Sequence, residues 1–401
     1  MTNGGLSKAR LGRMHDAVKG YVERGEVVGA ITVIERRGET HVDVQGLADR
    51  ENGTALKRDA IFRIASMTKP ITAVATLMLV EEGKVRLDEP VDRLLPELAN
   101  RKVLKRIDGP IDDTDLARRP ITTRDLLTFC LGFGMAMGPV ETPIQKAMTE
   151  TKIMGLNPSP SYTPDEWIKQ FATLPLMYQP GERWQYHTGS DILGVLIRRA
   201  SGMDLEAFFR ERIFEPLGMK DTGFSVPEKK LDRLGACYSV NMQTRELDLV
   251  DKPGKASNYA KPPLFPAGGG GLVSTADDYL AFARMLLNLG EGPKERILSR
   301  PSVETMTTDQ LNAQQKELSA FMPGYWDHRG WGFGCYVING RTSSATTPGN
   351  YGWGGAFGTT WNNDPKEEMI TILMVQRGGM GPGPAGLGAD FPTLAYQAID
   401  D

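Results

Sequence analysis

A serine and a lysine stand three residues apart within the stretch Phe62–Pro70, at Ser66 and Lys69. An apolar, strand-like run precedes Ser66 and apolar residues at helical spacing follow it, which predicts Ser66 at or just before a helix N-terminus. Residues three apart share one helix face, so the Lys69 amine can lie within hydrogen-bond reach of the serine hydroxyl. The free N–H groups of that helix end can stabilise an oxyanion. The pair therefore has the chemistry of a serine nucleophile with a basic helper.

Spacing alone does not establish this chemistry. Serine is a preferred residue at helix N-caps, and lysine is common on helix surfaces. A serine hydroxyl is also a poor nucleophile until a base removes its proton. The catalytic interpretation therefore needs partners elsewhere in the chain.

A second candidate base is Tyr186, which stands in a loop just before a predicted helix. Loops of this kind often present catalytic side chains. Lysine can act as a base when burial lowers its pKa, and tyrosine when neighbouring positive charge does so. The alternative is a structural tyrosine that anchors the loop, and the residues alone leave both interpretations open.

A third candidate segment is the glycine-rich stretch Tyr351–Trp361. Gly354 and Gly355 lead into a predicted strand, where they would let the backbone approach a ligand closely. A backbone N–H group there could join that of Ser66 in an oxyanion hole. A plain glycine-rich β-turn is the alternative.

The elements that must position these residues follow from periodicity. The sequence predicts strands at 28–34, 41–46, 60–64, 332–338, 355–361 and 368–375. It predicts helices at 7–24, 66–82, 121–128, 164–173, 190–201, 204–215, 275–288 and 392–399. Strands near both ends with helices between them indicate an α+β fold (an α/β sandwich), with an antiparallel sheet flanked by the N- and C-terminal helices.

The same pattern predicts two domains. Residues 1–85 and 270–401 would form a discontinuous α/β domain, and residues 86–269 a mostly helical one, with the active site at their interface. The run Pro262–Gly271 marks the clearest boundary, and we expect its glycines to let the backbone approach the site closely.

Composition excludes several classes of function. The chain has 401 residues, 40% of them hydrophobic and 24% charged, with a formal net charge of −3, so nothing indicates a nucleic-acid partner. The four histidines form no i, i+4 pair, so the sequence does not indicate a metal site, and neither a Gly-x-Ser-x-Gly elbow nor a P-loop occurs. The three cysteines are scattered, the N-terminus does not resemble a signal peptide, and no run of about 20 apolar residues occurs. We therefore expect a cytoplasmic protein without a membrane partner.

Taken together, in this order and spacing, the segments resemble the serine β-lactamase-like superfamily. This superfamily includes class C β-lactamases, D,D-peptidases and family VIII carboxylesterases. The resemblance covers nearly the whole chain and is carried by residues 62–96, 120–127, 186–202, 270–275 and 352–365. It implies that Ser66 is the acyl-forming nucleophile, Lys69 its helper base and Tyr186 the residue that moves protons to the leaving group and activates water. It also implies an oxyanion hole built from the N–H groups of Ser66 and Ala356.

Departures from the pattern indicate the subfamily. The β-lactamases and peptidases usually carry Tyr-x-Asn, whereas here His187 and Thr188 follow the tyrosine. Their third motif begins with Lys or His, whereas this chain has Trp353-Gly354-Gly355, as family VIII carboxylesterases do. Loss of that cation should weaken recognition of anionic β-lactams, and an apolar tryptophan suits an uncharged ester. We expect these five residues to contact the substrate.

The sequence thus predicts a serine hydrolase that cleaves short-chain carboxylic esters through an acyl-enzyme on Ser66. No metal or organic cofactor is expected, and weak hydrolysis of β-lactams would be compatible. The alternatives are a β-lactamase or D,D-peptidase or amidase, an acyltransferase on the same scaffold, and a non-catalytic binding protein. Cys130 as a nucleophile has no support in the sequence, and a buried, small apolar role fits it better.

Overall fold

A computed structural model describes residues 4–135, 141–154, 160–319, 323–345, 347–379 and 386–401. Its main feature is an antiparallel sheet, eight-stranded within these residues, in the order β10-β11-β12-β13-β14-β1-β2-β3. The strands are β10 (Arg329–Trp331), β11 (Tyr336–Ile338), β12 (Tyr351–Gly354), β13 (Thr360–Asp364), β14 (Met369–Met374), β1 (Gly29–Arg36), β2 (Glu39–Asp49) and β3 (Thr54–Ala55). The two ends of the chain therefore meet in one sheet, where Val33 lies opposite Ile372.

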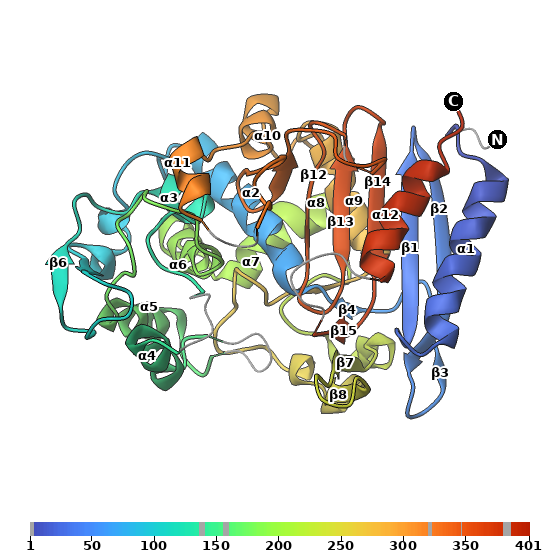
Figure 1. Cartoon of the computed structure of the whole chain (residues 1–401), viewed down its shortest axis with the longest axis horizontal. Coiled ribbons are helices and arrows are strands. Elements are labelled where there is room, and N and C mark those ends of the chain that lie inside the picture. The colour runs from blue at the N-terminus through green and yellow to red at the C-terminus, as the bar shows by residue number, and fades with distance from the viewer. Residues whose placement is uncertain (1–3, 136–140, 155–159, 320–322, 346, 380–385) are drawn as a thin grey trace.

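Helices cover both faces of this sheet (Figure 1). Helices α1 (Lys8–Glu23) and α12 (Leu387–Gln397) pack against each other and on β2 and β14, whereas α9 (Ala276–Leu287) packs on β13 and β14. In β1, Ile34 faces the cluster with α1 and α12, and Val33 faces the opposite core. Burial on both faces explains why β1 reads as a continuous apolar run rather than an alternating one. The structure confirms the expected α+β class.

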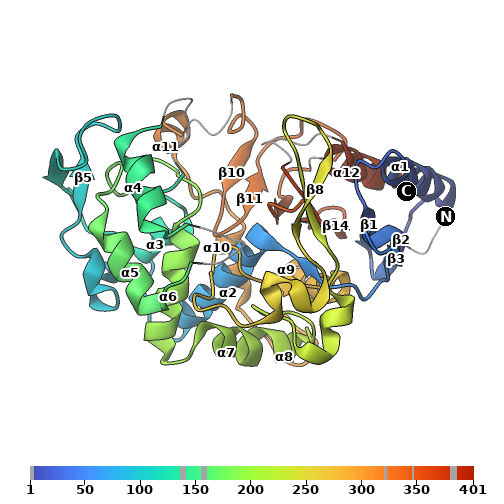
Figure 2. The same ribbon diagram turned by 90° about the horizontal axis from the view of Figure 1, so that it is seen from below.

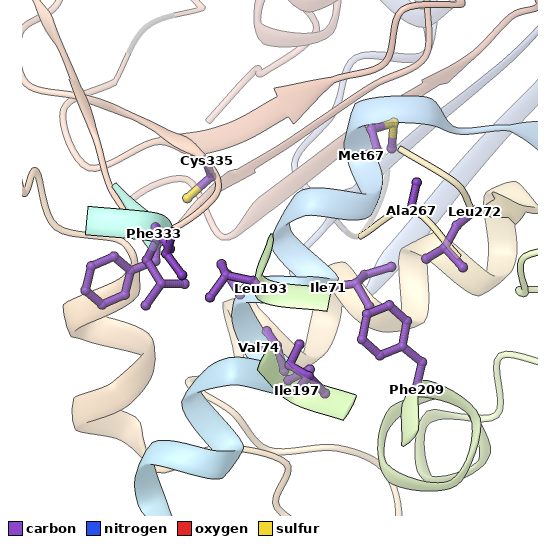
Figure 3. Packing of buried hydrophobic residues seen from close by; sticks show 14 of the residues in the cluster. Met67, Ile71, Val74, Leu193, Ile197, Phe209, Ala267, Leu272, Phe333 and Cys335 are labelled. Carbon is purple, nitrogen blue, oxygen red and sulfur yellow. The ribbon is translucent and has the colours of Figure 1, made fainter. Parts of the chain in front are cut away.

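Helix α2 (Thr68–Glu81) follows Ser66 and runs through the centre of the molecule (Figure 2). It is buried from Thr68 to Leu79 and packs on α6 (Gly189–Ser201) and α7 (Leu205–Phe209). Figure 3 shows Ile71 and Val74 of α2 among Leu193, Ile197 and Phe209. A mostly apolar helix of this kind is stable when neighbouring elements enclose it, and each fully buried Ile or Leu contributes about 1.5–3 kcal/mol. Ser66 thus lies directly before the N-terminus of a buried helix.

Shorter elements complete the described part of the chain. The remaining helices are α3 (Thr123–Leu127), α4 (Pro143–Thr151), α5 (Pro164–Thr173), α8 (Glu215–Leu217), α10 (Arg300–Met306) and α11 (Ala313–Glu317). The remaining strands are β4 (Phe62–Arg63) paired with β9 (Val273–Ser274), β5 (Lys102–Leu104) paired with β6 (Thr114–Leu116), and β7 (Cys237–Val240) between β8 (Leu247–Asp251) and β15 (Arg377–Gly378). Among the described residues, no helix is long and apolar enough to cross a membrane.

Four predicted elements were wrong in detail. Of the strand expected at 355–361, residues 355–359 form the turn between β12 and β13, where Gly358 has a φ of 85° that suits glycine, and only the last two residues belong to β13. Of the strand expected at 332–338, only β11 forms, because residues 332–335 make the turn that joins β10 to β11. The strand expected at 60–64 is shortened to β4, which pairs with β9 outside the large sheet. The helix expected at 204–215 is interrupted by a π-helical turn at Arg210–Phe214.

The division into domains at residues 85 and 270 stays a prediction. One cluster of buried apolar side chains runs from the sheet, at Ile31 and Ile372, into the helices, at Trp167 and Phe171. The sheet and the helices therefore share one continuous core.

Candidate active site

Ser66 lies where the sequence places it, in a 3-10 turn (Ala65–Met67) directly before α2. The turn is held from outside, because the Tyr279 hydroxyl donates to the Met67 carbonyl at 2.9 Å. Ala65 has a φ of 43°, in the left-handed region that residues other than glycine rarely adopt. Such backbone strain is found at functional sites when the surroundings enforce it. Ser66 itself is only 6% exposed.

The Lys69 amine is bound to the serine. Its Nζ lies 2.9 Å from Ser66 Oγ and also donates to the Gly269 carbonyl. Lys69 is 1% exposed, and this burial lowers its pKa to about 7, although Asp191 acts in the opposite direction. Burial disfavours a charged amine. Near neutral pH a substantial fraction of Lys69 is thus neutral and able to accept a proton.

Tyr186 completes the group around the serine. Its hydroxyl is hydrogen-bonded to Ser66 and accepts a hydrogen bond of 2.9 Å from Trp353 Nε1. Its ring lies 4.5 Å from Lys69 Nζ. Burial raises the pKa of Tyr186, and the bonds to Ser66 and Trp353 offset only part of that rise. At neutral pH the tyrosine is therefore a protonated donor.

The β12–β13 turn brings the third segment against the serine. β12 contacts the 3-10 turn of Ser66, and a Cβ placed on Gly355 would lie only 2.3 Å from the Ile64 carbonyl. The Gly355 N–H donates to the Thr359 carbonyl at 2.7 Å, which closes the turn. Ala356 is the next residue of this turn. Only glycine allows this approach of two backbones.

An aromatic cluster forms the wall behind Tyr186 and Trp353. Trp331 stands edge-on to Trp353 with ring centroids 4.6 Å apart, and Phe129 stands edge-on to Tyr186 at 5.7 Å. Trp184 stacks on Tyr186 at 5.8 Å. Such pairs fix the orientation of the rings. Trp353 is thus held by packing as well as by its hydrogen bond.

The two residues after Tyr186 are also buried here. Burial, with a smaller effect of Lys69, lowers the pKa of His187 to about 3, so its imidazole stays neutral. Thr188 is fully buried, and its Oγ1 has no hydrogen-bond partner among the described residues. Cys130 fits the apolar role expected for it, because burial raises the pKa of its thiol to about 12. The described residues contain no cluster of His, Cys, Asp or Glu that could hold a metal ion.

Sequence reasoning missed Asp191. This carboxylate lies in the first turn of α6, and its Oδ1 accepts a hydrogen bond of 2.8 Å from the Gly269 N–H. Its Oδ2 lies 3.7 Å from His187 Nδ1. The sequence shows only that Asp191 follows His187 by one helical turn. An acidic residue is common in the first turn of a helix, so this spacing does not distinguish a functional residue from an ordinary one. The expected close approach of the glycine run is confirmed, because the Gly269 carbonyl is the second partner of Lys69.

Comparison with known proteins places this geometry in a family. A family model described as Beta-lactamase matches residues 14–391. Esterase EstB of Burkholderia gladioli is 32% identical over 388 residues, which cover 92% of this chain and 91% of that protein. Protein Rv1367c of Mycobacterium tuberculosis (strain ATCC 25618 / H37Rv) is 38% identical over 367 residues, covering 90% and 88%.

Solved structures agree on the fold. EstCE1, described as a hydrolase with promiscuous acyltransferase activity, superposes with a TM-score of 0.80 and covers 98% of this chain and 99% of its own. At 23% identity, this likeness concerns the fold. Since the family model spans most of the chain and an esterase matches it over nearly its full length, the chain belongs to the Beta-lactamase family of serine hydrolases.

Proposed function

We propose that this protein is a carboxylesterase that hydrolyses short-chain esters through an acyl-enzyme on Ser66. The observation that supports this most directly is the 2.9 Å contact between Lys69 Nζ and Ser66 Oγ, with the Tyr186 hydroxyl bound to the same serine. The similarity to an esterase along most of the chain points to the same chemistry.

Lys69 acts as the base in the first step. In its neutral form it accepts the proton of Ser66 Oγ while that oxygen forms a bond to the ester carbonyl carbon. The depressed pKa of Lys69 and the raised pKa of Tyr186 favour the lysine in this role. The tetrahedral oxyanion is stabilised by the backbone N–H groups of Ser66 and Ala356.

Tyr186 acts when the alcohol leaves. Its hydroxyl gives its proton to the departing alkoxide as the bond between carbonyl carbon and alkoxy oxygen breaks, and the Lys69 ammonium returns a proton to the tyrosinate. Ser66 Oγ is hydrogen-bonded to both Lys69 Nζ and the Tyr186 hydroxyl, so it links the two groups. In the second half, water loses a proton to the same pair and attacks the acyl carbon, and Ser66 recovers its proton.

The site favours a neutral ester over a β-lactam. Trp353 stands where related β-lactamases have a cation, and its indole N–H is engaged with Tyr186. We assign Trp353, Gly354, Gly355, His187 and Thr188 to contacts with the substrate. In the proposed two-domain arrangement, the nucleophile and Trp353 come from the α/β part, and the residues of the Tyr186 loop come from the helical part.

Acyl transfer to an alcohol or amine is the second candidate. EstCE1, which shares the fold, is described as a hydrolase with promiscuous acyltransferase activity. The same acyl-enzyme serves both reactions, because an acceptor hydroxyl can take the place of water.

A fluorophosphonate probe tests the proposal. The wild type should be labelled on Ser66 and should hydrolyse p-nitrophenyl butyrate faster than a chromogenic cephalosporin, while Ser66→Ala should lose labelling and several orders of magnitude in kcat. An added alcohol that yields a transferred ester at the expense of free acid would point to the acyltransferase. Failure of the probe to label the wild type, or equal labelling of Ser66→Ala, would overturn the enzymatic function altogether.

A further inference from the structure

Asp191 and Lys69 bind the same glycine from opposite sides. Asp191 Oδ1 accepts the Gly269 N–H at 2.8 Å, and Lys69 Nζ donates to the Gly269 carbonyl. The glycine has no room for a side chain, because a Cβ there would lie 2.8 Å from Asp191 Oδ1. The backbone at Gly269, which Asp191 binds, therefore fixes the position of the Lys69 amine that contacts Ser66.

Burying a carboxylate at position 191 costs free energy. Asp191 is only 7% exposed, and an ionised carboxylate in such surroundings is stable only when it is paired. An uncharged Asn or Ser could accept the same N–H bond. The negative charge itself therefore calls for an explanation beyond the hydrogen bond.

The charge acts on Lys69. Burial raises the pKa of Asp191 and lowers that of Lys69, while each of the two groups offsets part of the shift of the other. The other titratable groups around the pair are Tyr186 and His187, on the same segment as Asp191. The packed segment 267–271 carries no titratable residue. On the neighbouring α3, the carboxylate of Asp125 is paired with Arg119.

We propose that Asp191 is a positioning residue of this hydrolase site, whose negative charge orients Lys69 through Gly269 and stabilises the ammonium formed when Ser66 gives up its proton. This inference rests on the proposed function. The proton moves from Ser66 Oγ to Lys69 Nζ, and Asp191 takes none. The logic is that of the buried aspartate of a serine protease triad, which orients the base and stabilises its charged form.

The substitution Asp191→Asn separates charge from shape, because asparagine keeps an oxygen for the Gly269 N–H. Its control is Asp278→Asn. Asp278 is also 7% exposed, lies in the first turn of α9 and accepts the Asp221 N–H at 2.7 Å. Asp191→Asn should lower kcat/KM for p-nitrophenyl butyrate about 10- to 100-fold, in the range of groups that orient a catalytic residue.

The pH profile gives a readout that a purely structural role would not move. Without the carboxylate, Lys69 loses its proton more readily, so the acid limb of kcat/KM should move to lower pH by about one unit. Asp278→Asn should keep the wild-type profile, even if it melts earlier. A wild-type profile in a folded Asp191→Asn enzyme would overturn the inference. Absence of fluorophosphonate labelling in the wild type would instead overturn the proposed function.

A second comparison holds even if Asp191→Asn does not fold alone. Lys69→Ala removes the partner and leaves an uncompensated buried carboxylate, which is strongly destabilising. Adding Asp191→Asn to Lys69→Ala should therefore raise the melting temperature above that of Lys69→Ala. A double variant that melts at or below the temperature of Lys69→Ala would show that the two groups are not coupled and would refute the proposal.

Discussion

The indole N–H of Trp353 donates a hydrogen bond of 2.9 Å to the hydroxyl of Tyr186. The two residues lie 167 positions apart and come from β12 and from the loop before α6. By resemblance, a Lys or His would stand at Trp353 in a β-lactamase. A neutral donor here lowers the pKa of Tyr186 without adding a charge that would attract an anionic substrate. One substitution can therefore alter both proton transfer and substrate preference.

Trp353→Phe should lower kcat for ester hydrolysis about tenfold while KM changes little, because a bond to the tyrosinate that forms in the reaction is lost. Steady-state kinetics with p-nitrophenyl butyrate measures this. Trp331→Phe is the matched control, since Trp331 is fully buried in the same cluster and its Nε1 has no hydrogen-bond partner among the described residues. Equal kinetic effects of the two substitutions would assign the role of Trp353 to packing alone.

The rate of acylation should increase as the pH rises through about 7, because burial lowers the pKa of Lys69 to about 7. Only the neutral amine of Lys69 accepts the serine proton, and this form dominates above the pKa of the lysine, so the rate rises with pH. The rate of fluorophosphonate labelling, measured from pH 5 to about 9, reports it without product release. Lys69→Arg keeps the cation but cannot lose a proton, so it should label at least about 100-fold more slowly. A flat profile in the wild type would contradict a lysine base.

Local relationships in the site could be predicted from sequence. Ser66 and Lys69 lie three apart at a helix start, and helix geometry alone brings them together. The capping box of Thr122 and Asp125 likewise marks α3. These features depend on a few neighbouring residues, so their spacing carries the information.

Contacts between residues far apart in the sequence could not be predicted. Asp191 reaches Lys69 through Gly269, which is 78 positions away from the carboxylate, and no sequence pattern links the three residues. The strand expected at 355–361 begins later than predicted, because the positive φ of Gly358 turns the chain before β13 starts. The hydrogen bond from the Trp353 N–H to Tyr186 joins residues 167 positions apart, and no sequence pattern indicates it.

Gly355→Ala should impair catalysis through the backbone. The added Cβ would lie 2.3 Å from the Ile64 carbonyl, so the turn that carries Ala356 must move away from Ser66. Loss of one oxyanion donor lowers kcat about 100- to 1,000-fold in serine hydrolases. Gly354→Ala is the control, because its Cβ would meet nothing closer than the Thr359 carbonyl at 3.3 Å. Comparable kcat values for the two variants would argue against Ala356 as an oxyanion donor.

Arg63 should anchor the strand that leads to Ser66. It is fully buried, it is paired with Asp251, and it donates to the Gly235 carbonyl and to Ser257. Arg63→Ala leaves the Asp251 carboxylate buried without its cation, which should lower the free energy of unfolding by about 3–5 kcal/mol. Urea denaturation measures the loss. Lys255→Ala breaks an exposed pair with Glu228 and should leave stability nearly unchanged. If both variants unfold at the same urea concentration, the Arg63 pair does not support the fold, and the position of Ser66 must depend on α2 alone.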